Sequence, residues 1–110
     1  NNYYFQDESN NVSYLISQRN YEQQQNADSL IQIAFQALSN YINPKIEEEK
    51  ESWLIRANNR EYVFKYNKIY YRVRYIYSND SLYQLLVVGN KKSVNQIKNA
   101  NFFEQFIVSN

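Results

Sequence analysis

The stretch YYRVRYIYSNDSLYQLLVVGN, residues 70–90, decides the fold. Two runs rich in aromatic and β-branched residues flank a polar segment at residues 78–81, which is typical of two antiparallel strands joined by a tight turn. Alternate side chains of a strand point to opposite faces of its sheet, so Arg72 and Arg74 share one polar face. We expect a helix to cover the other, uncharged face, which consists of Tyr71, Val73, Tyr75 and Tyr77.

Further strands are predicted on both sides of this hairpin, wherever aromatic and β-branched residues lie between turn formers. The run EYVFKY precedes the hairpin and is separated from it by the turn residues Asn67 and Lys68. The strand that contains KIEEEKESWLIR begins with a charged part, which we expect to protrude into solvent. The predicted strands outside the hairpin cover residues 3–6, 12–17, 45–56, 61–66 and 106–108.

A helix is predicted over residues 27–42, because its apolar residues recur at the spacing of one helical face. Asn26 or Asp28 is suited to cap its first turn, and Pro44 prevents its continuation. A second helix is predicted from Ser93, where Gln96 stands three residues on, at the spacing of a capping box. The apolar face of the first helix consists of Leu30, Ile31, Ala34, Leu38, Tyr41 and Ile42, widened by Ile33 and Phe35.

The predicted element order is β-β-α-β-β-β-β-α-β, without a repeated β-α-β crossover. Tight turns between the middle strands indicate antiparallel pairing, which places the chain in the α+β class. We therefore expect one domain over residues 1–110, an antiparallel sheet of about six strands flanked by helices. Because the sequence begins at Asn1 and has no methionine, we expect a processed chain or a domain of a longer protein.

The composition argues against several classes of function. The chain has 12 basic and 11 acidic residues, a near balance that disfavours a dedicated polyanion binder. It contains no His and no Cys, the side chains most used for acid–base, thiol and metal chemistry near neutral pH. A single Gly precludes a glycine-rich phosphate loop. We therefore predict a protein that is not an enzyme and uses no cofactor or metal. No apolar run approaches the roughly 20 residues of a membrane-spanning helix.

The polar face of the sheet supplies the candidate contact surface, to which we assign Lys65, Arg72, Arg74 and Gln84. Arginines between tyrosines are typical of sheets that bind single-stranded nucleic acid, because bases stack on aromatic rings and guanidinium groups hold phosphates. The alternative is that Glu61, or the acidic cluster at residues 47–51, pairs with the two arginines. The missing basic excess favours pairing and makes nucleic acid the less favoured partner.

The acidic run EEEKE, residues 47–51, is interpreted as a solvated arm. Adjacent carboxylates point to opposite faces in a strand and fan out around a helix, so they do not converge on one cation. The arm remains a second candidate for contact with a partner because we expect it to protrude.

With the strands placed, residues 60–108 resemble the C-terminal half of PsbP-like domains, which occur in many uncharacterised bacterial exported proteins and lipoproteins. The motifs that carry the resemblance are Arg60-Glu61-Tyr62, Arg72-Val73-Arg74, Leu82-Tyr83-Gln84-Leu85 and Phe102-Phe103-Glu104-Gln105-Phe106. The chain departs from the family at Asn59, where a Gly usually stands, and at Gln105, where a small residue usually stands. The first half of the chain matches in layout only.

The resemblance implies an α-β-α sandwich, in a superfamily with photosystem II extrinsic subunits and Ran-binding nuclear-transport factors. Their shared theme is protein binding without catalysis, but fold does not fix function, and the matched positions transfer no functional site. The leading hypothesis is a non-catalytic protein-binding or accessory domain for an unidentified protein partner. The resemblance implies an extracytoplasmic or envelope location, with any membrane anchor outside this chain. The alternative is a single-stranded nucleic-acid binder that uses Arg72, Arg74 and exposed tyrosines.

Overall fold

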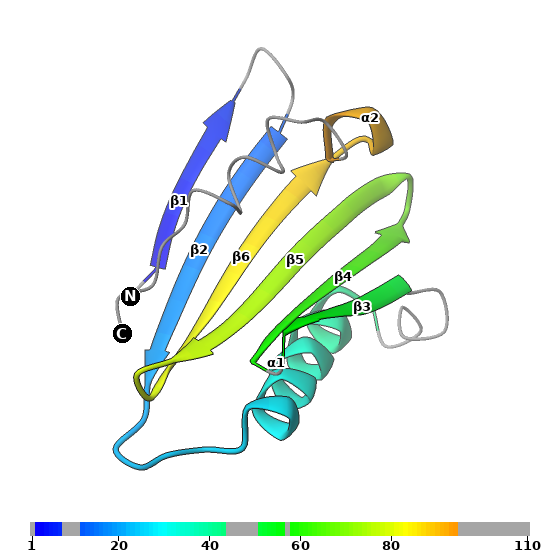
Figure 1. The fold of residues 1–110 in the computed structure, drawn as a ribbon. Helices are drawn as coiled ribbons and strands as arrows, with labels where there is room; N and C mark the ends of the chain where they lie inside the picture. The colour runs from blue at the N-terminus through cyan, green and yellow to red at the C-terminus, as the bar shows by residue number, and fades with distance from the viewer. Residues whose placement is uncertain (1, 8–11, 44–50, 57, 95–110) are drawn as a thin grey trace.

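The structure is a computed structural model that describes residues 2–7, 12–43, 51–56 and 58–94, with the backbone alone for 2–7 and 51–56. Its centre is an antiparallel sheet in which the strands lie in the order β1-β2-β6-β5-β4-β3 (Figure 1). The strands are β1 (Asn2–Asp7), β2 (Val12–Asn20), β3 (Glu51–Arg56), β4 (Asn59–Tyr66), β5 (Ile69–Ser78) and β6 (Ser81–Gly89).

Two tight turns set the register of the central strands. Asn67 and Lys68 join β4 to β5, and Asn79 and Asp80 join β5 to β6. All four residues have positive φ, between 52° and 67°. Positive φ at both central positions defines the type I′ turn, whose twist matches that of a β-hairpin. The resulting pairs, Tyr66 with Ile69 and Ser78 with Ser81, confirm the two predicted hairpins.

One face of the sheet packs against the helix α1 (Ala27–Ile42), which lies near β3 and β4 in Figure 1. Phe35 is 1% exposed, and its ring stacks on Tyr62 with centroids 3.8 Å apart. The ring of Phe64 packs edge-on against the ring of Phe35, with centroids 5.6 Å apart. The prediction that the uncharged face of β5 lies under the helix is confirmed, since the cluster around Phe35 includes Val73, Tyr75 and Tyr77 and, partly buried, Tyr71.

The ends of α1 follow the sequence closely. The side chain of Asn26 accepts a hydrogen bond from the backbone N–H of Ser29 at 2.9 Å, so Asn26 is the cap. The inward face was predicted less well. The buried face of the helix is centred on Ile31 and Phe35. Ile33 and Tyr41 therefore point outward, and they are 64% and 89% exposed.

The opposite face of the sheet carries a second, smaller core. Its buried members come from β2, β6 and α2 (Lys91–Val94), and are Val12, Tyr14, Leu85, Val87 and Val94. Ile16, Tyr70 and Ile76 pack against them with part of their surface exposed. Both faces of the central strands are therefore buried over much of their length, and little of the sheet is an open platform within the described residues.

The predicted α-β-α sandwich is wrong, although the coarse class, α+β, is confirmed. The structure is mostly an antiparallel sheet of four long strands, β2, β6, β5 and β4, with one long helix on one face. The strands β1 and β3 at the edges have six residues each. The second predicted helix is described only as α2, which has four residues and is too short to form a layer. The predicted strand at 106–108 lies outside the described residues.

We expect Phe35→Ala to lower the free energy of unfolding by about 3–5 kcal/mol, because it empties the centre of the helix–sheet interface. Urea denaturation checks this value. Tyr41→Ala is the control on the same helix and should change stability by no more than about 0.5 kcal/mol, since Tyr41 is exposed. Equal effects of the two substitutions would contradict the packing described.

Candidate functional site

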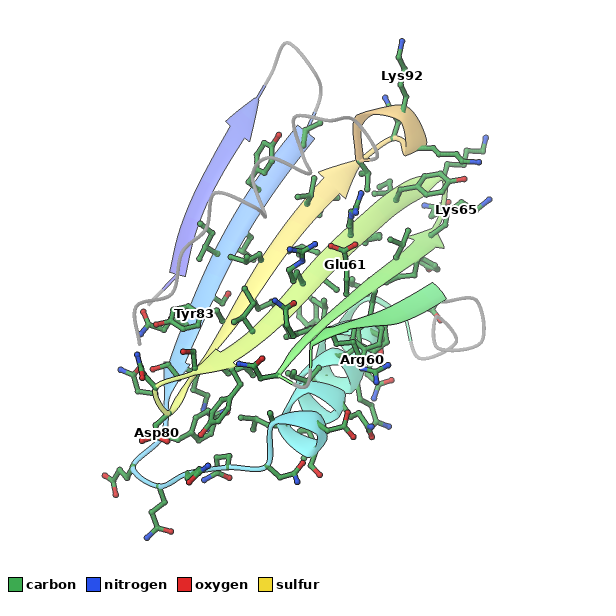
Figure 2. The ribbon with its side chains drawn as sticks, in the orientation of Figure 1. Arg60, Glu61, Lys65, Asp80, Tyr83 and Lys92 are labelled. Carbon is green, nitrogen blue, oxygen red and sulfur yellow. The ribbon has the colours of Figure 1, made fainter. Side chains whose placement is uncertain are left out.

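The polar face of the sheet contains a compact ionic cluster of Glu61, Arg72 and Arg74. Glu61 on β4 pairs directly across from Arg74 on β5, and Arg72 lies two residues along the same strand. Nη2 of Arg72 donates to Oε2 of Glu61 at 2.8 Å, and Nε of Arg74 donates to Oε1 at 3.1 Å. Nη2 of Arg74 also lies 3.1 Å from Oε1. Both carboxylate oxygens are thus held by guanidinium groups. Figure 2 labels Glu61 on the sheet.

The burial of this cluster indicates that it stabilises the fold. Glu61 is 0% exposed, and the side chains of Arg72 and Arg74 are 18% and 10% exposed. A carboxylate in such a place requires a cationic partner, because an unpaired buried charge is strongly destabilising. The alternative in which Glu61 pairs with the arginines is therefore the one found. Both guanidinium groups that the nucleic-acid hypothesis required for phosphate binding are bonded to Glu61 instead.

The four residues of the predicted contact surface do not form one surface. Lys65 lies on the same face as the arginines and is exposed, with its Nζ 5.8 Å from the centroid of Tyr70. Gln84 lies on the other face, opposite Tyr75, whose hydroxyl donates to Gln84 Oε1 at 2.7 Å. Burial, and secondarily the nearby Tyr62, raises the pKa of the Tyr75 phenol, which keeps it a hydrogen-bond donor.

Lysines gather instead at one end of the sheet, a feature that the sequence analysis missed. Lys65 and Lys68 lie at the tip of the β4–β5 hairpin, while Lys91 and Lys92 begin α2 directly after β6. All four side chains are exposed. We call this group the lysine end; Figure 2 labels two of its members, Lys65 and Lys92, at the end of the sheet opposite Asp80.

The turn between β5 and β6 could have predicted this group of lysines from the sequence. Once residues 79 and 80 form the turn, the register pairs Tyr70 with Gly89. Lys68 lies two residues before Tyr70, and Lys91 lies two residues after Gly89. Both lysines are therefore at the same end of the sheet. The two pairs of lysines are more than 20 residues apart in the sequence, so a search for local basic runs does not bring the pairs together.

The outward side of α1 is a second surface that the sequence analysis did not assign. Ile33, Ala37 and Tyr41 lie four residues apart, so they follow one line along the helix. All three are exposed. Asp28 in the first turn is the one charged residue of the helix, and residues 29–42 contain none. We call Ile33, Ala37 and Tyr41 the outer stripe of α1.

Two further predictions concern metals and membranes. Within the described ranges, no three Asp or Glu residues form a group that could hold a metal ion. Residues 47–50 of the acidic run lie outside the described residues, so the predicted arm is not placed. Among the described helices, none has the length and apolar character that a membrane span requires.

The comparisons with known proteins establish a shared fold and nothing about function. No protein-family model matches the chain, and no curated protein matches it. Among solved structures, the chain is similar to a Pseudomonas aeruginosa protein described as of unknown function and as a candidate regulator. The TM-score is 0.53 at 13% identity, over 90% of this chain and 73% of that one. The PsbP-like resemblance and the exported location therefore stay predictions.

We expect Glu61→Ala to lower the free energy of unfolding by about 3–5 kcal/mol, because it leaves two largely buried guanidinium groups without their carboxylate. Denaturant unfolding measures the loss. The matched control is Lys65→Ala on the same strand, where the side chain is exposed and the expected change is within about 0.5 kcal/mol. A stable Glu61→Ala protein would show that the cluster is dispensable for folding.

Proposed function

We propose that this chain is a non-catalytic domain that binds a protein partner through the outer stripe of α1. The observation that supports the proposal is the chemistry of the helix surface. An exposed helical face usually carries charged and polar residues, whereas α1 has no charge after Asp28 and exposes Ile33 and Tyr41. The surroundings of the stripe are also uncharged, since Gln32, Gln36 and Asn40 are its exposed neighbours on the helix.

An uncharged stripe of this kind suits contact with a protein. The centres of protein interfaces are depleted in charged residues and enriched in aromatic residues, because neutral groups lose less hydration energy on burial. Anchors four residues apart on one helix are the pattern by which a helix enters an apolar groove. The partner chemistry that fits is therefore an apolar groove or patch with acceptors for the Tyr41 hydroxyl. Single exposed hydrophobic residues are ordinary on any surface, but these three are aligned.

The non-catalytic part of the proposal rests on the composition and on the role of Glu61. The sequence has no His or Cys, and Glu61, the buried carboxylate among the described residues, is bonded to Arg72 and Arg74. A buried carboxylate that is ion-paired in this way stabilises the fold, and we assign it no catalytic role. A chemical turnover that disappears when Glu61 is replaced in a folded variant would contradict this part.

The binding proposal is tested with a photoactivatable amino acid at position 37, in the middle of the outer stripe. We expect ultraviolet light to cross-link this variant to one defined protein in the cells that express it. Mass spectrometry identifies that protein, and titration of the purified pair gives the dissociation constant. Ile33→Lys should weaken binding by about 30-fold or more, because it places a charge in a desolvated interface.

Gln32→Lys is the matched control, since it adds the same charge at the adjacent exposed position outside the stripe. We expect it to change the dissociation constant by about two-fold or less, as for residues at the rim of an interface. Equal weakening by both substitutions, or the absence of a defined cross-linked protein, would contradict the proposal.

A further inference from the structure

We propose that the lysine end binds the surface of a membrane that contains anionic lipids. This inference is independent of the outer stripe of α1 and concerns a different part of the molecule. Lys65, Lys68, Lys91 and Lys92 are all the lysines whose side chains the structure describes, and they lie together at one end of the sheet. Among the side chains that the structure describes, no ion pair joins any of these lysines to an acidic residue.

The acidic side chains that the structure describes lie elsewhere. Asp80 is in the turn at the opposite end of β5, and the backbone N–H of Tyr21, next to Glu22, donates to its carbonyl at 2.8 Å. Asp28 lies 3.8 Å from Arg60, toward that same end. Glu61 is neutralised by its two arginines. Asp7 and Glu51, of which the structure describes the backbone alone, stand at strand positions toward the lysine end, since Asp7 pairs with Val12 and Glu51 pairs with Val63. Against the four lysines, these two residues still leave an excess of positive charge at this end among the residues that the structure places. Glu47, Glu48 and Glu49 lie outside the described residues.

The two ends of the sheet are far enough apart for the acidic residues of the far end to have little effect on the lysines. The strand β5 has ten residues, which at about 3.3 Å per residue gives a length of roughly 30 Å. Electrostatic interactions in 0.1 M salt are screened over about 10 Å. The acidic residues of the far end therefore do not cancel the attraction of the lysine end for an anionic surface, although the net charge of the chain is only +1.

Apolar side chains accompany the lysines at the hairpin tip. Tyr66 and Ile69 pair across the turn and are 39% and 41% exposed. Between them stand Asn67 and Lys68, both in the left-handed conformation that the type I′ turn requires. A tip of this kind presents apolar surface and cations together. That combination binds membrane interfaces, where apolar groups enter the headgroup region and lysines attract the lipid charges.

The type of cation favours a lipid surface over a protein or a nucleic acid. No arginine side chain lies at this end among those that the structure describes, since Arg19 and Arg60 lie toward the other end and Arg72 and Arg74 bind Glu61. Arginine forks bind carboxylates and phosphates with two aligned hydrogen bonds, whereas lysine acts as a flexible point charge. Lysines are also depleted in protein interfaces. Point charges suit the diffuse negative potential of a bilayer.

The experiment measures co-sedimentation of the 110-residue protein with vesicles. One set contains phosphatidylcholine with about 30% phosphatidylserine, and the other contains phosphatidylcholine alone. We expect binding to the anionic vesicles in about 0.05 M salt and its loss in about 0.5 M salt. Each lysine should contribute roughly five-fold, so the variant with Lys65→Gln, Lys68→Gln, Lys91→Gln and Lys92→Gln should bind several hundred-fold more weakly.

Two further variants separate the local from the overall charge. Lys92→Gln and Arg19→Gln change the net charge equally, but only Lys92 belongs to the lysine end. We expect about a five-fold loss for Lys92→Gln and less than a two-fold loss for Arg19→Gln. Tyr66→Ser with Ile69→Ser should weaken binding and leave its salt dependence intact, because it removes apolar surface and no charge. Unchanged unfolding midpoints establish that each variant is folded.

Three results would overturn the inference. The first is equal binding to both kinds of vesicle, and the second is equal loss for Lys92→Gln and Arg19→Gln. The third is tighter, lysine-dependent binding to a single-stranded oligonucleotide or to a poly-glutamate peptide, which would assign the lysine end to a nucleic acid or to an acidic protein. Binding to the anionic vesicles that follows the lysines, with weaker binding to both soluble polyanions, supports it.

Discussion

The two type I′ turns are the constraint on which the rest of this structure depends. Asn67 with Lys68, and Asn79 with Asp80, adopt the positive φ values that reverse the chain within two residues. A turn this short leaves one register for the strands that it joins. Because side chains alternate between faces, a shift by one residue would exchange the two faces of a strand. The turns therefore decide which side chains meet α1 and which meet Glu61.

The ionic cluster makes the same register favourable for a second reason. In the observed pairing, Glu61 lies opposite Arg74 and accepts bonds from both arginines. In a shifted pairing, β4 and β5 would bring Glu61 to a different neighbour and leave a buried carboxylate without its cations, at a cost of several kcal/mol. The cluster thus disfavours wrong registers of the central strands. Its role in the fold explains why arginines stand between the tyrosines of β5.

The features that the sequence predicts correctly are local ones. The turns are encoded in two adjacent residues each, the cap of α1 lies in Asn26, and the inward position of Tyr75 follows from alternation alone. The errors concern distant parts of the chain. The spacing of Ser93 and Gln96, together with a family resemblance, led to a second helical layer, whereas the structure describes only one helical turn there. Polar character suggested that Gln84 belongs to a contact surface, but its register places it beside the buried hydroxyl of Tyr75.

The charge distribution shows why the overall composition was a poor guide to the surface of this protein. A net charge of +1 suggests a neutral molecule, yet the described lysines lie at one end of the sheet, and Asp28 and Asp80 lie toward the other. Screening acts over about 10 Å, so a ligand near either end responds to the local charge rather than to the sum. Arg72 and Arg74, by contrast, were conspicuous in the sequence and are largely buried in the cluster with Glu61. Cations matter for binding only where the fold leaves them exposed, and in this chain the sheet register decides which ones those are.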